Sequence, residues 1–96
     1  MERINPEKAE KAIKLYVKQL GLEEKFKQYR ILKTFNEIVG ETVLKHIKTK
    51  TIHGRKLFVY MDSAIARNQI FMQRNAIIKK INEMYGEYIL DEIILN

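Results

Sequence analysis

The sequence predicts an α+β protein in which helices pack on one face of a three-stranded sheet. Apolar residues recur at the three- and four-residue spacing of amphipathic helices over roughly 6–20, 23–47 and 63–85. Between the last two segments, and again at the end of the chain, this spacing gives way to short β-branched and aromatic runs typical of strands. The predicted order is helix, helix, strand, strand, helix, strand, and 96 residues suffice for one core, so we expect a single domain over 1–96.

The first helix is expected to begin after Asn5, which is a good N-cap before a proline at the first helical position. Gly21 is a typical stop signal for it. Two acids stand four residues before two lysines and can pair with them locally, as Glu7–Lys11 and Glu10–Lys14. We therefore interpret this segment as a solvated amphipathic helix without a binding role.

The second helical region contains Gly40, which predicts either a kink or a break into two helices. Lys45 and Lys48 are expected to lie at its C-terminal end, where cations are favoured. The residues around Gly54 then predict two strands, roughly 48–53 and 56–61, joined by a hairpin turn.

The third helix has a capping signal at each end, with Asp62 and Ser63 before it and Gly86 after it. Its predicted core stripe is Ala66, Ile70, Ile77, Ile81 and Met84, widened by Phe71. The closing segment "EYILDEIIL" predicts a third strand with Ile89, Ile93 and Leu95 on one face. The residues expected at the centre of the core are Leu57, Val59, Ile70, Ile77 and Ile93.

Charge is distributed unevenly along the chain, whose net charge is +6. Residues 45–80 carry nine Lys/Arg and only one acid, Asp62, whereas residues 81–96 carry four acids and no Lys/Arg. Such a basic region attracts phosphate polymers, although lysines on a hairpin also keep an edge strand from aggregating. For the hairpin alone, phosphate binding and protection of the edge strand explain the lysines about equally well. The length of the basic region favours phosphate binding. The candidate nucleic-acid-binding residues are Lys45, Lys48, Lys50, Arg55, Lys56, Arg67 and Arg74.

Two aromatic residues of the second predicted strand, Phe58 and Tyr60, point to the face opposite Leu57 and Val59. If the helices cover only the other face, this pair lies exposed with Ile94 beside it and can stack on bases or contact a partner. The alternative is that another element, such as the first helix, covers it.

Catalytic and metal-binding patterns are missing from the sequence. There is no cysteine, no glycine-rich phosphate loop and no nucleophile with a positioned base, and Ser63 is better explained as a helix cap. His46 and His53 have no third ligand nearby. We expect no cofactor, no metal and no enzymatic activity. With no apolar run long enough to span a membrane and no leader, we expect a soluble cytoplasmic protein without membrane contact.

Three segments together resemble one family: "FNEIVGETVLKHIKTKTI", "GRKLFVYMDSAIARNQI" and "IIKKINEMYGEYILDEIIL". Their order is similar to that of the DciA family, formerly a domain of unknown function and now associated with loading the bacterial replicative helicase. The shared features are an aromatic followed by Ile-Val-Gly, a hairpin ending in Leu-x-Val, a Ser-led helix and an Asn-x-x-x-Gly turn. The resemblance covers about residues 10–95 and implies a K-homology-like fold, with the replicative helicase and DNA as partners.

The sequence also departs from the family pattern. Phe35 stands where the family usually has tryptophan, and Gln69 stands where an acid is common. Longer members carry a flexible C-terminal tail implicated in the helicase and DNA contacts. We expect this shorter form to lack that tail, which bears on loading activity more than on DNA affinity. The Gly-x-x-Gly clamp of K-homology domains is absent, since Gly40, Gly54 and Gly86 are isolated, so any nucleic-acid contact should be electrostatic and weakly sequence-selective. The alternatives are an RNA- or ribosome-associated protein and a pure protein-interaction domain.

Overall fold

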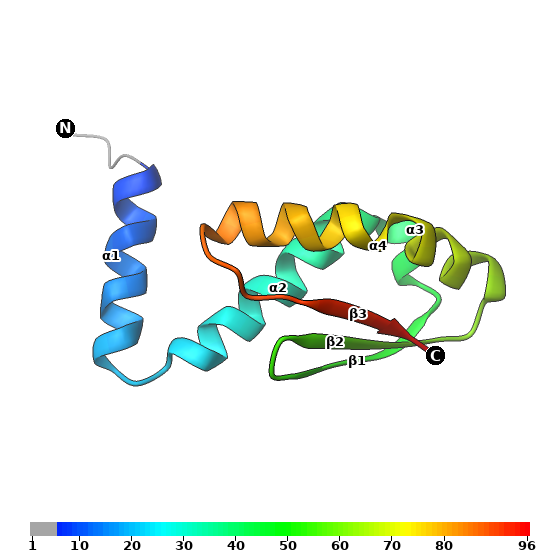
Figure 1. Cartoon of the computed structure of the whole chain (residues 1–96), viewed down its shortest axis with the longest axis horizontal. Coiled ribbons are helices and arrows are strands. Elements are labelled where there is room, and N and C mark those ends of the chain that lie inside the picture. Colours follow the sequence, from blue (N-terminus) through cyan, green and yellow to red (C-terminus); the bar gives the residue numbers. More distant parts are fainter. Residues whose placement is uncertain (1–5) are drawn as a thin grey trace.

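The computed structural model describes residues 6–96 (Figure 1), so the predicted N-cap at Asn5 lies outside the described residues. The elements are α1 (Pro6–Gln19), α2 (Glu23–Val39), α3 (Glu41–Leu44), β1 (Ile47–His53), β2 (Lys56–Met61), α4 (Ala64–Tyr85) and β3 (Glu92–Leu95). The predicted α+β order is confirmed, with the second helical region divided into α2 and α3.

The division occurs at Gly40, whose φ of 79° is one that glycine adopts without strain. Its main-chain N–H still donates to the carbonyl of Asn36, which closes α2, and α3 then ends at Leu44. The prediction that Lys45 and Lys48 end a long helix is therefore wrong. Lys45 follows α3 as its C-cap residue, and Lys48 lies within β1, because the chain turns into the sheet after the break.

The sheet has the order β1-β2-β3, with β1 antiparallel to β2 and β2 parallel to β3. Helix α4 connects the two parallel strands, which need a crossover of this kind. The register places Leu57 opposite Ile93 and Val59 opposite Leu95, so the apolar side chains of β2 and β3 share one face.

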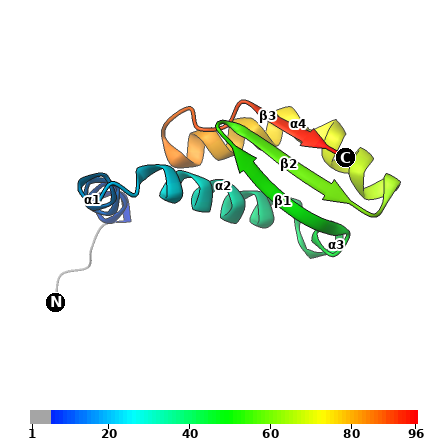
Figure 2. The same cartoon turned by 90° about the horizontal axis from the view of Figure 1, so that it is seen from below.

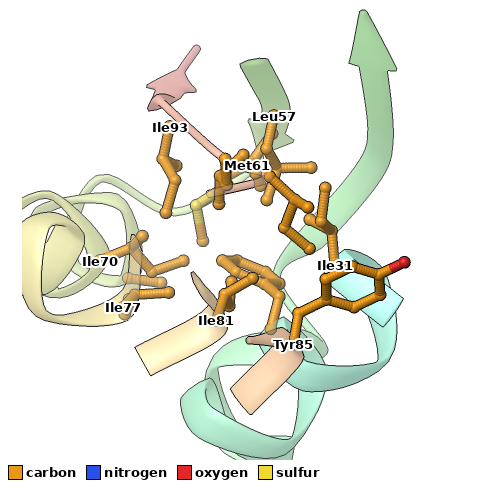
Figure 3. Packing of buried hydrophobic residues seen from close by; sticks show 13 residues of the cluster. Ile31, Leu57, Met61, Ile70, Ile77, Ile81, Tyr85 and Ile93 are labelled. Atoms are coloured by element: carbon orange, nitrogen blue, oxygen red, sulfur yellow. The ribbon is translucent and has the colours of Figure 1, made fainter. Parts of the chain in front are cut away.

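Helices α2 and α4 cover that face, and Figure 2 shows the sheet lying in front of them when it is seen from its other side. All five residues predicted at the centre of the core are buried between sheet and helices. Figure 3 labels Leu57, Ile70, Ile77 and Ile93 among them. Phe35 and Ile31 contribute from α2, and both are buried as well. Phe35 thus serves as an aromatic anchor of the core.

Two residues assigned to the core stripe of α4 lie outside it. Met84 is 42% exposed, and Tyr85, at 4% exposed, takes its place because Ile77, Ile81 and Tyr85 continue the same row at four-residue steps. Phe71 is 51% exposed, since its position next to Ile70 in the helix turns it away from the sheet.

Helix α1 stands away from the sheet beyond the start of α2 (Figure 1), and none of its described residues is buried. The predicted Glu10–Lys14 pair is wrong because both side chains reach other elements. Glu10 pairs with Arg30 of α2, with 3.2 Å between Oε1 and Nη2. Lys14 donates to the main-chain carbonyl of Tyr85, and its Nζ lies 3.9 Å from the centre of that ring.

The side chain of Asn82 makes three hydrogen bonds to the segment between α4 and β3. Its Oδ1 accepts hydrogen bonds from the main-chain N–H groups of Ile89 and Leu90 at 2.8 and 2.9 Å, and its Nδ2 donates to the carbonyl of Leu90 at 3.0 Å. Gly86 ends α4 in the left-handed conformation, with φ of 85°. These two residues form the Asn-x-x-x-Gly turn noted in the sequence, and together they lead the chain into β3.

Candidate nucleic-acid interface

Five of the seven candidate cations lie along the hairpin of β1 and β2. Lys45 precedes β1, Lys48 and Lys50 belong to it, Arg55 lies in the turn, and Lys56 begins β2. Because β1 is an edge strand, these side chains border one open side of the sheet. Lys45, Lys48, Arg55 and Lys56 are exposed, and we call the five residues the hairpin cations.

Lys50 differs from the other hairpin cations because it faces the helices. It is paired with Val59, whose side chain is buried on the helix-covered face, and its Nζ donates to Oδ1 of Asn36 on α2. Partial burial lowers the pKa of Lys50 from its ordinary value of 10.5, since the charged form is less well hydrated there. Lys50 therefore links β1 to α2 in addition to contributing charge.

Carboxylates partly neutralise two of the hairpin cations. Lys48 Nζ lies 3.3 Å from Oδ2 of Asp62, whose Oδ1 is 3.1 Å from Nδ1 of His46. The hydrogen bond from Lys48, followed by that from His46, holds the pKa of Asp62 below its ordinary value. Lys56 Nζ lies 3.6 Å from Oε2 of Glu92. All these groups are well exposed, and ion pairs of this kind contribute only about 0–1 kcal/mol, so a phosphate can replace either carboxylate.

The remaining two candidates, Arg67 and Arg74, lie on α4 and not on the hairpin. Arg67 lines a groove with Leu95 of β3, which is the edge of the sheet opposite β1. Arg74 donates from Nη1 to the carbonyl of Phe71 at 2.7 Å and stacks on its ring. The structure thus brings five candidates together and sets these two apart, on the far side of the sheet.

The aromatic pair of β2 lies on the face that α2 and α4 leave open. Tyr60 is 56% exposed, and Phe58 is partly exposed, flanked by Ile94 and by the edge-on ring of His53 at 5.7 Å between ring centres. Within residues 6–96 no helix lies over this face, and α1, considered above as a cover, projects away from it (Figure 2). Phe58 and Tyr60 therefore lie on the open face together with Lys56 of the same strand, whereas Lys50 lies on the helix-covered side of the sheet.

Other kinds of site find no support in the part of the chain that the structure describes. No group of three or more His, Cys, Asp or Glu side chains is placed to hold a metal ion there, and His46 contacts Asp62 instead. Ser63 caps α4 by accepting a hydrogen bond from the N–H of Ala66 at 3.2 Å, as predicted. Over residues 6–96, no helix combines the length and the apolar character needed to cross a membrane.

The sequence model of one protein family, described as Dna[CI] antecedent, DciA, matches residues 8–95. The chain belongs to the DciA family. The DciA family acts in bacterial DNA replication, where it is associated with helicase loading. It is a non-catalytic accessory family, and its role in replication implies a cytoplasmic protein. No curated protein and no solved structure matches the chain, so the K-homology likeness of this DciA-family fold stays a prediction.

Proposed function

We propose that this DciA-family chain binds single-stranded DNA through the hairpin cations and the adjoining open sheet face, as a non-catalytic partner of the replicative helicase. The observation that carries the proposal is the set of four exposed cations along one edge hairpin, Lys45, Lys48, Arg55 and Lys56, whose sheet carries Phe58 and Tyr60 on its open face. Cations spaced along a groove or edge follow a phosphate backbone, and exposed rings stack on bases of any sequence. Such a surface binds with weak sequence selectivity.

Strand geometry supports a linear contact. Successive residues of a strand advance by about 3.3 Å, so the hairpin cations extend over roughly 20 Å or more, which matches several nucleotides rather than one phosphate. Lys48 and Lys56 can exchange their weak carboxylate partners for phosphates, while Lys45 and Arg55 have no ion pair among the described residues. The contact is therefore electrostatic and sensitive to salt.

The test reverses three hairpin cations, with Lys45→Glu, Lys48→Glu and Arg55→Glu in one variant. These positions are exposed and none belongs to the core cluster, and the ring that Arg55 approaches, Tyr88, is itself exposed, so the fold should persist. We expect affinity for a labelled oligothymidine strand to fall at least about tenfold, and to fall equally for a mixed sequence, because phosphate contacts position without specifying. Fluorescence anisotropy at low salt measures the affinity for each of the two strands.

A matched control has the same change in net charge elsewhere: Lys11→Glu, Lys18→Glu and Lys25→Glu. All three positions are exposed on α1 and the start of α2, and the control avoids Lys14, which contacts Tyr85. We expect this variant to retain most of its affinity. If it loses as much as the hairpin variant, net charge alone sets binding and the hairpin surface is not a site.

The helicase partnership has its own test. Size-exclusion chromatography of this chain with the cognate replicative helicase, with and without oligothymidine, is expected to show a shared peak. Separate elution under both conditions would contradict the partnership while leaving the DNA-binding proposal intact.

A further inference from the structure

The outer edge of β3 carries main-chain groups that the described sheet does not use. Asn96 directs both of its groups to β2, with its N–H donating to Val59 and its carbonyl accepting from Met61, each at 3.0 Å. In a parallel pair successive residues alternate in direction, so Ile93 and Leu95 direct their N–H and C=O groups outward. The strand order β1-β2-β3 leaves no neighbour on that side within residues 6–96.

The two edges of the sheet differ in how they are protected. The β1 edge carries Lys48 and Lys50 and a register irregularity between Ile47 and Thr49, all features that discourage strand addition. The β3 edge has the sequence Glu-Ile-Ile-Leu, without lysine or proline. It is short but otherwise open to pairing with another strand.

Helix α4 and strand β3 run side by side in opposite directions (Figure 1). Residues of both elements line a groove next to the open edge. It has a volume of about 240 Å³ and is lined by Ala64, Arg67, Asn68, Phe71 and Leu95. The Nε of Arg67 is buried and makes no hydrogen bond. Arg74 lies seven residues, about two turns, beyond Arg67 on the same side of α4, with its guanidinium 4.0 Å from the centre of the Phe71 ring.

Neither Arg67, which lines this groove, nor Arg74, which stacks on the Phe71 ring beside it, is paired with a carboxylate in the described residues. The ion pairs of residues 6–96 use Lys27, Arg30, Lys48, Lys56, Lys79 and His46, but not Arg67 or Arg74. The groove is thus cationic and partly apolar, next to unused main-chain donors and acceptors. An edge strand beside a helix is the arrangement that captures an extended peptide by strand addition.

We propose that the β3 edge and the α4 groove bind an extended acidic segment of another protein, which adds as a fourth strand. Main-chain hydrogen bonds to Ile93 and Leu95 hold the segment, and its carboxylates meet Arg67 and Arg74. A second copy of this chain is the less suitable occupant. Edge-to-edge pairing about a two-fold axis brings the two α4 helices together, so that the arginines of one copy approach the like-charged arginines of the other copy. This surface is separate from the hairpin cations, and its test does not depend on DNA binding.

The test uses a blocked ten-residue peptide in which valine and glutamate alternate, and a second peptide with lysine in place of glutamate. In amide hydrogen exchange followed by NMR, the free protein should show fast exchange at Ile93 and Leu95 and slower exchange at Ile94, which faces β2. A saturating concentration of the glutamate peptide should protect Ile93 and Leu95. The lysine peptide should leave both unprotected.

Two matched pairs of variants separate the components of binding. Arg67→Glu with Arg74→Glu should raise the Kd for the glutamate peptide at least about tenfold, whereas Lys79→Glu with Lys80→Glu, the same charge change on the same helix, should raise it much less. Leu95→Pro removes an outward N–H and should weaken binding more than Leu95→Ala, which removes the side chain but keeps the donor.

The proposal is overturned if neither amide is protected at millimolar glutamate peptide, or if both peptides bind equally. Without any peptide, the amides of Ile93 and Leu95 could instead become protected as the protein concentration rises. That result would assign the edge to a second copy of the chain and would also overturn the proposal.

Discussion

At the residue scale, Asn82 has the most concentrated structural role in this DciA-family chain. One side chain satisfies three main-chain groups of the segment that leads into β3. We expect Asn82→Ala to lower the free energy of unfolding by about 2–3 kcal/mol, because it leaves partly buried donors and an acceptor unpaired. Urea denaturation followed by circular dichroism measures the loss.

The conservative change Asn82→Asp gives the matched comparison. A carboxylate can still accept from Ile89 and Leu90 but cannot donate to the carbonyl of Leu90. The free energy of unfolding of the Asn82→Asp variant should therefore lie between those of the wild type and the Asn82→Ala variant. Equal stability of all three proteins would show that the turn is held by other contacts.

Tyr85 should make stability depend on alkaline pH. Burial, with a smaller effect of Glu87, raises the pKa of Tyr85 above its ordinary value of 10.0, and Figure 3 shows its ring at the margin of the core cluster. A pKa raised by folding stabilises the protein below the unfolded pKa, and this contribution is lost as pH rises from about 10 through the folded pKa. The wild type should therefore lose stability relative to Tyr85→Phe above pH 10.

Chemical denaturation of both proteins between pH 8 and 11 measures this difference. Lys50, whose lowered pKa acts in the opposite sense over the same range, is present in both proteins and cancels in the comparison. A difference between the two proteins that stays constant with pH would contradict the assignment.

At the element scale, α1 is the helix least integrated with the rest of the described chain. Its contacts include one ion pair to Arg30 and the approach of Lys14 to Tyr85, and none of its residues is buried. Deletion of residues 1–20 should therefore lower the free energy of unfolding by only about 1–2 kcal/mol. A truncated protein that fails to fold cooperatively would show that α1 supports the core.

The elements themselves could be predicted largely from local pattern. The hairpin around Gly54, the Ser63 cap and the core stripe of α4 depend on spacing and capping within a few residues, and the structure confirms them. Met84 and Phe71 were predicted in the core stripe but are exposed. Each is next in sequence to a buried residue and so lies 100° around the helix from it, where a side chain can fall on either side of the boundary between core and solvent.

At the scale of the whole molecule, sequence pattern could not give the arrangement of charges. Lys56 meets Glu92 because β3 returns parallel to β2, and Arg67 lies beside Leu95 of β3 because α4 crosses over to that edge. Both facts depend on the topology of the sheet, which composition does not encode. The basic region of the sequence is therefore divided between two surfaces in space.

The salt dependence of single-stranded DNA binding tests the central claim most directly. If three to five hairpin cations contact phosphates, a plot of log affinity against log salt should have a slope of about −2 to −3.5, at roughly −0.7 per contact. The variant with Lys45, Lys48 and Arg55 changed to glutamate should show a flatter slope, and the Lys11, Lys18 and Lys25 control should keep that of the wild type. A wild-type slope near zero, or no binding at low salt, would contradict the claim that the hairpin binds DNA.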